Sequence, residues 1–556
     1  MRIFKDVIVV AMLCSVLCWV LARWIWKKQR SRRSVVPLNW PVVGMMPALL
    51  QNARRIHEYV TEVLRQSGGT IEIKGPWFAN MDMLVTCDPA NVDHILSRNF
   101  ENYPKGPHFR KIFHVVGDAM INVDSELWEL HRRTTTPLMN QANFRTSLET
   151  NVSEKMENGL FPVLDHYALQ GSHIDLQEIF QRTAFDISCQ QFLNKDPESL
   201  CVDPTGDHPF RGAIRDTVNA ILYRHIIPER CWKLQKYYGI DREKKLSEAD
   251  RAFDNFLYPI LEERMEHLNK TEQPHNSGSD SGMLTSHIET HRGKSMKFLR
   301  DTFLTLIIAG GDATASALTW FFMLLAQNPH VEAKILHDII QLKQDKVKVV
   351  FKVEECQKLT YLHAAICESL RLFPPIPLNH KTPMEKDILP SGHVVTPNTQ
   401  IIMSFYSMGR MDTVWGKDCM EFKPERWISL NGEIKRQPSY KYPVFNAGPR
   451  SCIGREMALT MVKMIAATLI YHYQFQLVEP HHLEVLITDS IILEKKHGLK
   501  VKFSKRKRLP AEDRGEGTSG RACRCGVAPC VAELLLGDYW SGGRMMTVQW
   551  NCSVFY

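Results

Sequence analysis

The sequence predicts a mainly α-helical body with a smaller β part, the α+β class, and two observations carry this prediction. Residues from about 90 to 370 show mostly the helical spacing of apolar side chains, with few strand signals. Residues 374–405 read instead as short strands and turns, and 497–505 read as a last strand. The hydrophobic content of 44% and the charged content of 23% are typical of a globular protein with a sizeable core.

The N-terminus predicts a membrane anchor. An uncharged run from Val7 to Ala22 is followed, after Arg23, by the letters WIW, and together they supply about 20 residues, enough to cross a bilayer core as a helix. Six Lys and Arg side chains between Arg23 and Arg33 place the body in the cytosol by the positive-inside rule. A cleaved signal peptide is the alternative, but the basic cluster stands on the wrong side of the run for that. We therefore expect residues 1–33 to form a single-pass anchor.

Composition divides the rest of the chain. Residues 34–50 contain three prolines, which predicts a stiff linker. Residues 51–508 carry the helical and strand patterns and form the expected folded domain, in which 69–90 alternates like a β-hairpin and 269–283 reads as a polar surface loop. Residues 509–556 are Gly-rich and low in large aliphatic side chains, which predicts a disordered extension.

Charge and cysteine content narrow the class of protein. A formal net charge of +8 is mild for a nucleic-acid-binding protein, and no basic stripe interleaved with aromatic side chains accompanies it, so we expect no nucleic-acid partner. This charge suits membrane lipid or an acidic protein. The fourteen cysteines show no framework of pairs, which favours a reducing compartment. Cys523, Cys525 and Cys530 lack the paired spacing of a zinc site.

Cys452 has the most specific surroundings in the chain. It lies in FNAGPRSCIG, residues 445–454, just before a long helical pattern. A thiolate that binds a metal benefits from backbone N–H groups aimed at its sulfur, and Gly448 and Gly454 let the main chain approach because no Cβ intervenes. The helix that begins near Gly454 directs its N-terminal dipole at an anion. A core cysteine needs none of this, so the pattern favours a thiolate ligand.

These ten residues resemble the haem-binding signature of the cytochrome P-450 monooxygenases, F-x-x-G-x-R-x-C-x-G, with every fixed position matched. The resemblance implies the cytochrome P-450 fold and a haem b whose iron takes Cys452 as its metal ligand. It also implies that Phe445 shields the sulfur from water and that Arg450 pairs with a haem propionate.

Two further motifs occur in the order that this family shows. Trp128 and Arg132, in WELHR, lie one turn apart on an expected helix and carry N–H donors suited to haem propionates. Glu368 and Arg371, in ESLR, lie three residues apart on a helix that two prolines end, and Arg426 follows in FKPERW. The resemblance implies that Glu368, Arg371 and Arg426 form a buried network that braces the fold without taking part in the reaction.

The run from Phe303 to Leu325 is long and apolar enough for a second membrane span, but Asp312 in its middle disfavours that reading. It resembles instead the family's central helix, on which the acid relays protons to bound oxygen. The family usually has Thr directly after this acid, and this chain has Ala313. Thr314 follows, but it points about 100° further round the helix. Either Thr314 supplies the hydroxyl that is missing at position 313, or the substrate supplies one, or the reaction depends less on oxygen insertion.

The resemblance covers about residues 36 to 508 and is strongest to a plant clan of fatty-acid and alkane hydroxylases, on stretches such as FENYPKGPHF and DILPSGHVV. It implies an endoplasmic-reticulum enzyme that uses O2 and NADPH electrons, delivered by NADPH-cytochrome P-450 reductase, to hydroxylate long-chain apolar substrates. Basic residues that could meet an acidic reductase are Arg132, Arg133, Arg455 and Lys463. Oxidative phenol coupling, known from a sister group, is one alternative, and a haem-binding protein with little turnover is another, because Ala313 replaces Thr.

Apolar residues on several segments are expected, by the same resemblance, to wall the substrate pocket. Such walls suit an aliphatic chain that enters from the membrane. The same residue types fill ordinary protein cores, so each of these residues could equally belong to the hydrophobic core. The residues are Phe113, Val115, Val116, Ile308, Ala309, Ala313, Ile376, Pro377, Leu378, Ile491 and Ile492.

Overall fold

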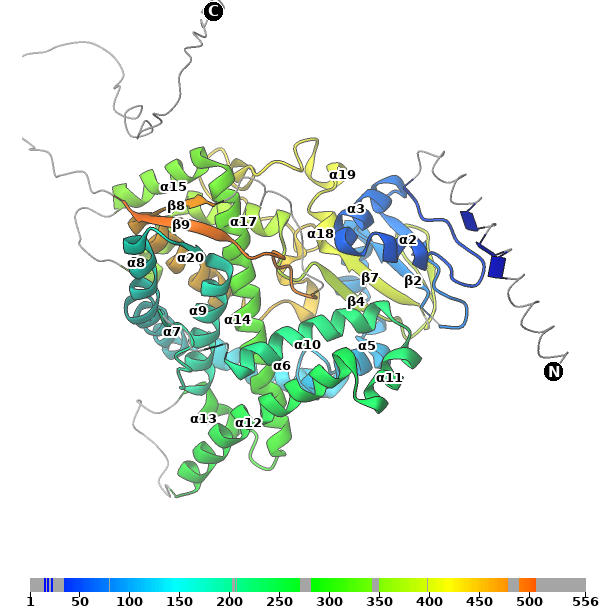
Figure 1. Ribbon diagram of the computed structural model, residues 1–556, viewed down its shortest axis with the longest axis horizontal. Helices are drawn as coiled ribbons and strands as arrows, with labels where there is room; N and C mark the ends of the chain where they lie inside the picture. The colour runs from blue at the N-terminus through cyan, green and yellow to red at the C-terminus, as the bar shows by residue number, and fades with distance from the viewer. Residues whose placement is uncertain are drawn as a thin grey trace, which may run out of the picture. The chain divides into compact units, whose positions relative to one another are not determined.

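The computed structural model (Figure 1) describes residues 35–79, 81–202, 206, 208–270, 282–342, 350–397, 399–478 and 490–506, together with 15–16, 18–19 and 22–23. Most of the expected anchor, most of the expected loop at 269–283 and all of the expected extension at 509–556 lie outside these residues. Contacts divide the chain into Met1–Arg506 and Lys507–Tyr556, and everything below concerns the first unit.

Helices dominate the described chain, which confirms the predicted helix-rich class. Between about 90 and 370 one three-residue strand interrupts the described helices. The helices are α2 (Met46–Gln51), α3 (Ile56–Gln66), α4 (Pro89–Asp93), α5 (Gly106–Ile112), α6 (Ser125–Asn140), α7 (Ala142–Lys155), α8 (Phe161–Gln170), α9 (Leu176–Leu193), α10 (Pro209–Ile226), α11 (Glu229–Tyr238), α12 (Asp241–Lys270), α13 (Met283–Thr290), α14 (Met296–Gln327), α15 (Pro329–Leu342), α16 (Val353–Lys358), α17 (Thr360–Leu372), α18 (Phe405–Met408), α19 (Asp412–Trp415) and α20 (Arg455–His472).

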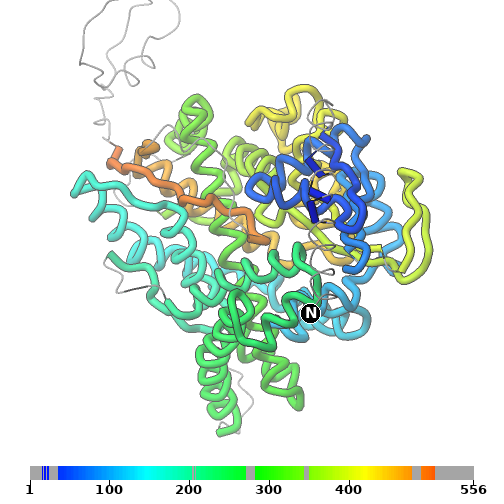
Figure 2. The backbone as a smooth tube through the Cα atoms, turned by 45° about the vertical axis from the view of Figure 1, so that its right-hand side comes forward, coloured from blue at the N-terminus to red at the C-terminus, as the bar shows by residue number. Residues whose placement is uncertain are grey.

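Small sheets form the β part among the described residues. The strands are β1 (Thr70–Ile73), β2 (Met83–Thr86), β3 (His173–Asp175), β4 (Leu378–Lys381), β5 (Asp387–Ile388), β6 (Val394–Val395), β7 (Gln400–Ser404), β8 (Tyr473–Leu477) and β9 (Lys500–Lys505). Their orders are β1-β2-β7-β4, β3-β9-β8 and β5-β6. The predicted hairpin is β1 paired antiparallel with β2, and β2 pairs in parallel with β7, which brings early and late segments side by side (Figure 2).

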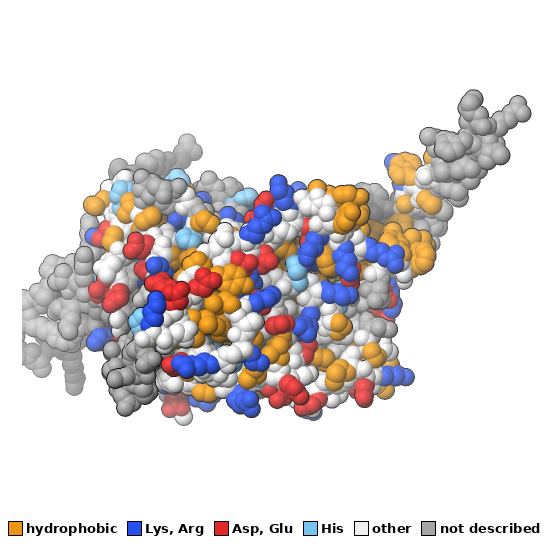
Figure 3. All heavy atoms as spheres, turned by 90° about the horizontal axis from the view of Figure 1, so that it is seen from below, with side chains coloured by type: hydrophobic (Ala, Val, Ile, Leu, Met, Phe, Trp, Pro, Cys, Tyr) orange, Lys and Arg blue, Asp and Glu red, His pale blue; other side chains and the backbone are white. Residues whose placement is uncertain are grey.

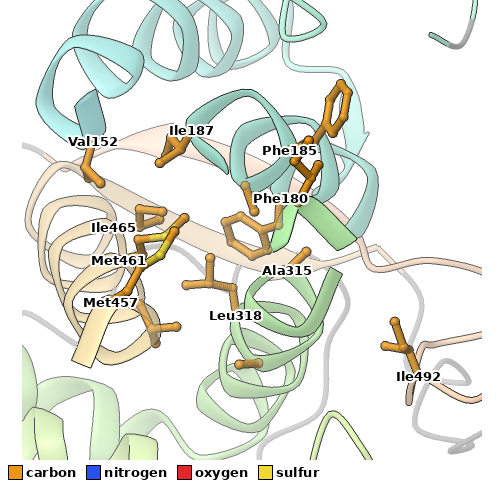
Figure 4. Close-up of a cluster of buried hydrophobic side chains, with 14 of the residues drawn as sticks. Val152, Phe180, Phe185, Ile187, Ala315, Leu318, Met457, Met461, Ile465 and Ile492 are labelled. Atoms are coloured by element: carbon orange, nitrogen blue, oxygen red, sulfur yellow. The ribbon is translucent and has the colours of Figure 1, made fainter. Parts of the chain in front are cut away.

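Helix α14 is the central element of the core. It packs against α9, α12, α17 and α20, and Figure 4 shows Ala315 and Leu318 of α14 near Phe180 of α9 and Met461 of α20. Within the described residues it is the one helix long and apolar enough to span a membrane, but 72% of its most apolar window is buried inside the protein. A helix that its neighbours bury on most of its faces carries apolar side chains on those faces. We therefore interpret α14 as a core helix and not as a second span.

Basic and acidic side chains are interspersed on the face seen in Figure 3. Exposed ion pairs occur on the surface, for example Lys334 with Glu425, whose charged atoms lie 2.7 Å apart. Water screens such a pair, so it contributes little to stability. On this face the basic side chains are thus not separated from the acidic ones.

Candidate active site

Cys452 lies in the loop that precedes α20, and this loop is tightly built. The N–H of Cys452 donates to the carbonyl oxygen of Phe445 at 2.8 Å. Gly448 has a φ of +65°, and a Cβ there would lie 1.8 Å from the carbonyl oxygen of Leu96, so only glycine fits. At Gly454 a Cβ would meet the sulfur of Cys452 at 3.8 Å, an ordinary contact. Gly448 is therefore required for packing against Leu96 and not against the sulfur, whereas the N–H that reaches the sulfur is that of Gly454.

The thiol of Cys452 is enclosed by protein yet keeps exposed surface, so it borders open space inside the fold. Burial raises its pKa above the ordinary cysteine value. The N–H of Gly454, which donates to the sulfur, and the charges of Arg132 and Arg455 act in the opposite direction. The expected backbone donor is thus present, but it does not outweigh burial. A coordinated metal ion is what ionises a thiol in such surroundings.

Helix α6 and Arg450 gather hydrogen-bond donors beside this loop. One terminal nitrogen of Arg450 donates to Asp124 at 2.6 Å, and its guanidinium carbon lies 4.7 Å from the ring centre of Trp128. Arg132 donates to the carbonyl oxygen of Ser451 at 2.6 Å, next to the candidate ligand. Trp128 and Arg132 line an open hollow of about 580 Å³ on α6. The structure thus brings both predicted α6 residues to the cysteine loop.

Two buried lysines near Arg450 were not found from the sequence. The Nζ of Lys105 donates to Asn379 at 3.0 Å, and the Nζ of Lys381 donates to the carbonyl oxygen of Tyr103 at 2.6 Å. Burial, with repulsion from Arg450, lowers the pKa of Lys105 to about 7 and that of Lys381 well below its ordinary value. Their signal in the sequence was weak, because neither the end of strand β4, where Lys381 lies, nor the residue before α5, which is Lys105, shows in the sequence that its side chain faces inward.

A haem fits this set of residues. Its two propionates are carboxylates, and Arg450, Lys105 and Lys381 bring three basic side chains to a single acid, Asp124. The Nε of Arg450 is buried and has no hydrogen-bond partner among the described residues. An orphaned donor is unfavourable, and burial disfavours the charged form of the two amines. An anionic group at this place would accept from the donor and favour the charged amines.

On α14, the structure separates the predicted acid from the predicted hydroxyl. Ala309 is exposed, and Asp312 and Ala313 are partly exposed, although the helix around them is largely buried. This face of α14 therefore borders open space. Thr314 is only 2% exposed and lies in the core. Burial raises the pKa of Asp312 to about 6, opposed by the charge of Arg211.

Glu368, Arg371 and Arg426 lie together, as the resemblance implied. Two nitrogens of Arg371 each lie 2.8 Å from a carboxylate oxygen of Glu368, and the Nε of Arg426 lies 3.3 Å from one of them. Trp427, which the sequence analysis missed although it directly follows Arg426, donates its indole N–H to Glu368 at 2.8 Å. Arg371 also donates to the carbonyl oxygens of Gly409, Cys419 and Glu421. The buried charges are thus paired.

The expected pocket residues divide into two groups. Ala309 and Ile376 are exposed, and those partly exposed are Ile308, Ala313, Leu378 and Ile491. The remaining residues are buried and belong to the core in this structure: Phe113, Val115, Val116, Pro377 and Ile492. Phe113 is typical of these, because its ring stacks on that of Phe109 at 4.1 Å instead of turning outward.

Comparisons with known proteins agree with this geometry. A family model described as Cytochrome P-450 matches residues 35–503. The Arabidopsis thaliana protein named Alkane hydroxylase MAH1 is 41% identical over 474 residues, which cover 84% of this chain and 93% of that protein. Noroxomaritidine synthase from Narcissus aff. pseudonarcissus MK-2014 is 37% identical over 501 residues, which cover 89% and 96% of the two chains.

The match spans nearly the whole described chain and includes the cysteine loop, α14 and the Glu368 network. Members of this family hold haem through a cysteine thiolate and are monooxygenases. The relatives named as hydroxylases and synthases differ among themselves, so the match gives the reaction class and not the substrate. This chain belongs to the cytochrome P-450 family and is a haem-thiolate monooxygenase.

Proposed function

We propose that this enzyme hydroxylates long-chain aliphatic molecules, alkanes or fatty acids of the wax and cuticle type. The observation that carries the proposal is the aliphatic character of the open face around Asp312. Ala309 and Ile308 of α14 contribute to it, and we infer that Ile376 does so too, because this residue is 43% exposed. Ile376 adjoins Pro375, whose carbonyl oxygen accepts from the N–H of Leu493 at 2.9 Å. Apolar walls with one acid suit an alkyl chain, and the similarity to a protein named as an alkane hydroxylase supports the same substrate class.

In this proposal each residue of the site has a physical task. Cys452 would bind the haem iron, and Arg450, Lys105, Lys381, Trp128 and Arg132 would hold the propionates. When bound, the haem supplies the activation of oxygen. Asp312 holds and passes a proton on the open face of α14, while the aliphatic walls exclude water and position the C–H bond.

Reconstitution with the reductase, NADPH and paired substrates tests this assignment. A long-chain alkane or fatty acid should yield an alcohol, and a phenolic substrate of similar volume should yield no coupled product. Coupled phenols without aliphatic alcohols would contradict the proposal. The variant Ile376→Phe is a useful companion, because a larger side chain at this exposed position should shift the hydroxylated carbon along the chain if Ile376 touches the substrate.

Oxidative phenol coupling is the second candidate, and the position of Thr314 favours it. Coupling joins two carbon atoms without inserting oxygen, so it needs less help from a hydroxyl on the open face of α14. That face carries Ala313, while Thr314 lies in the core. Consumption of NADPH that yields only peroxide with both substrate classes would instead favour a haem protein with little turnover.

Location and electron supply complete the proposal. Residues 1–33 anchor the enzyme in the endoplasmic reticulum membrane with the domain in the cytosol. Three apolar side chains are exposed, Val42 within the linker and Trp77 and Phe78 after it. The N–H of Trp77 donates to the carbonyl oxygen of Val42 at 3.1 Å. Such a patch suits contact with lipid. NADPH electrons arrive through the reductase at a basic hollow of about 530 Å³ beside α20, to which Lys435, Arg436, Arg455 and Lys463 contribute.

A further inference from the structure

The segment after residue 490 crosses the seam between α9 and α14 and is fixed to both helices. The carbonyl oxygen of Leu493 accepts from the Oγ of Ser316 at 2.6 Å and from the indole N–H of Trp320 at 2.7 Å. Two residues later, the N–H of Lys495 donates to Gln177 of α9 at 2.9 Å. Glu494 lies between these two attachments, so its place at the seam is set by its neighbours on both sides.

Glu494 is thereby brought next to the turn of α14 that carries Asp312. Ser316 follows Asp312 by four residues and lies on the same side of the helix. The carboxylate of Glu494 accepts from the Nε2 of Gln181, on α9, at 3.0 Å. Burial raises the pKa of Glu494, and the charge of Asp312 adds to this effect.

Helix α9 also carries a partly exposed carboxylate, that of Glu178. Glu178 lies one turn before Gln181 on α9, and 35% of its side chain is exposed. Glu178 accepts from Arg182 at 2.8 Å and from Arg211 of α10 at 3.0 Å. Three charged groups affect the pKa of Glu494: Asp312 of α14 and Glu178 of α9 raise it, and Arg215 of α10 lowers it.

We propose that Glu494 is a proton-relay residue that acts through Asp312, and this inference rests on the proposed role of Asp312 in proton delivery. In each transfer the O–H bond of the Glu494 carboxyl breaks, the proton crosses through hydrogen-bonded water, and an O–H bond forms on Asp312. Glu494 then regains a proton from solvent on the side of Glu178. No electrons move in this step, and one proton passes inward. The relay supplies protons to the open face of α14, on which Ala313 offers no hydroxyl.

The protonation states suit this task. Burial raises the pKa of Glu494 to about 8, with the charge of Asp312 adding to it, and the pKa of Asp312 is raised to about 6. Two close carboxyls cannot both ionise freely. Near neutral pH the outer group therefore holds a proton and the inner group can accept one. Above pH 8 Glu494 loses its proton, so delivery should fail as the pH rises through that value.

The pH profile of product formation by the holoenzyme tests the relay. For the wild type we expect product per NADPH to fall as the pH rises through about 8. Glu494→Gln should lower turnover about tenfold, remove this limb of the profile and raise the solvent deuterium isotope effect. Glu494→Asp, which restores a titratable acid, should recover part of the turnover and part of the pH dependence, and it should bring the isotope effect back towards the wild-type value. A Glu494→Gln enzyme with the wild-type profile and isotope effect would overturn the proposal.

A second measurement is independent of turnover and of the substrate. Infrared difference spectra of the resting holoenzyme against pH should show a protonated carboxyl that titrates near pH 8 and is absent from Glu494→Gln. In Asp312→Asn the midpoint of this titration should move to lower pH, because the repelling charge is gone. An unchanged midpoint would contradict the coupling of the two carboxyls even if no substrate were turned over. Failure of every substrate with an intact titration would instead contradict only the proposed function.

Discussion

At the scale of single residues, position 313 carries an alanine where the family usually has Thr. Ala313 and Asp312 share the open face of α14, and Thr314 lies in the core. The sequence predicted that Thr314 points about 100° away from position 313, because of helical geometry, but its burial follows from the packing around α14. Lys105 and Lys381 could not be predicted in the same way, since their charges matter only after three distant segments meet around Arg450.

The first prediction at this scale concerns the missing hydroxyl. Ala313→Thr places one on the open face, where a hydrogen bond of about 1 kcal/mol corresponds to roughly a fivefold change in a rate or equilibrium. We expect the fraction of NADPH electrons recovered in product to rise a few-fold. Product and peroxide measured side by side give this fraction. Unchanged coupling would mean that Thr314 or a substrate hydroxyl already serves.

The second prediction concerns the buried acid. The folded-state pKa of Asp312 is raised from 3.8 to about 6, so the free energy of unfolding falls as the pH rises through this window and stays lower above it. Asp312→Asn should therefore stabilise the protein by about 3 kcal/mol at neutral pH and by roughly half as much near pH 5. Turnover should fall about 100-fold.

Denaturant unfolding at the two pH values, followed by tryptophan fluorescence and haem absorbance, checks this prediction. Lys334→Ala, at an exposed ion pair, serves as the control for general effects of pH. An equal gain for Asp312→Asn at both pH values would contradict a raised pKa as its cause.

At the scale of elements, α17 and the segment after α19 are joined by the Glu368 network. The motif residues could be named from the sequence because they stand at fixed spacing, and Pro374 and Pro375 correctly marked the end of α17 near Leu372. The carbonyl oxygens that saturate Arg371 could not be named, because they belong to turns that no local pattern describes.

The prediction for this element compares two ion pairs. Glu368→Ala leaves Arg371 and Arg426 buried without their acid, which should destabilise the fold by about 3–5 kcal/mol and sharply lower the yield of haem-loaded protein. Lys334→Ala removes a partner of Glu425 at an exposed pair of similar length and should change stability by less than about 1 kcal/mol. Thermal midpoints of the two variants measure the difference. Equal midpoints would contradict the bracing role of the network.

At the scale of the whole molecule, the described domain carries its candidate site on α14, on α6 and on the loop before α20, which distant parts of the chain supply. The fold class and the hairpin were visible in the sequence, because each rests on a local period, whereas the central helix was expected from the resemblance. The assembly of three small sheets was not visible, since β2 pairs with β7 only after the chain between them has folded.

The basic hollow beside α20 carries a prediction for the electron supply. The double variant Lys435→Glu and Arg436→Glu reverses the charge of two exposed basic side chains. It should raise the KM for the reductase about tenfold at low ionic strength, and added salt should make this difference smaller. Lys270→Glu, on an exposed helix end, is the charge control. A KM that is unchanged, or unchanged by salt, would place the reductase elsewhere.

The bond between Cys452 and the haem iron is the central claim, and the spectrum of the reduced protein under carbon monoxide tests it most directly. The account predicts a strongly red-shifted Soret band for the wild type and its loss, together with turnover, in Cys452→Ser. A haem-loaded Cys452→Ser protein that kept both the red-shifted band and its turnover would contradict the account.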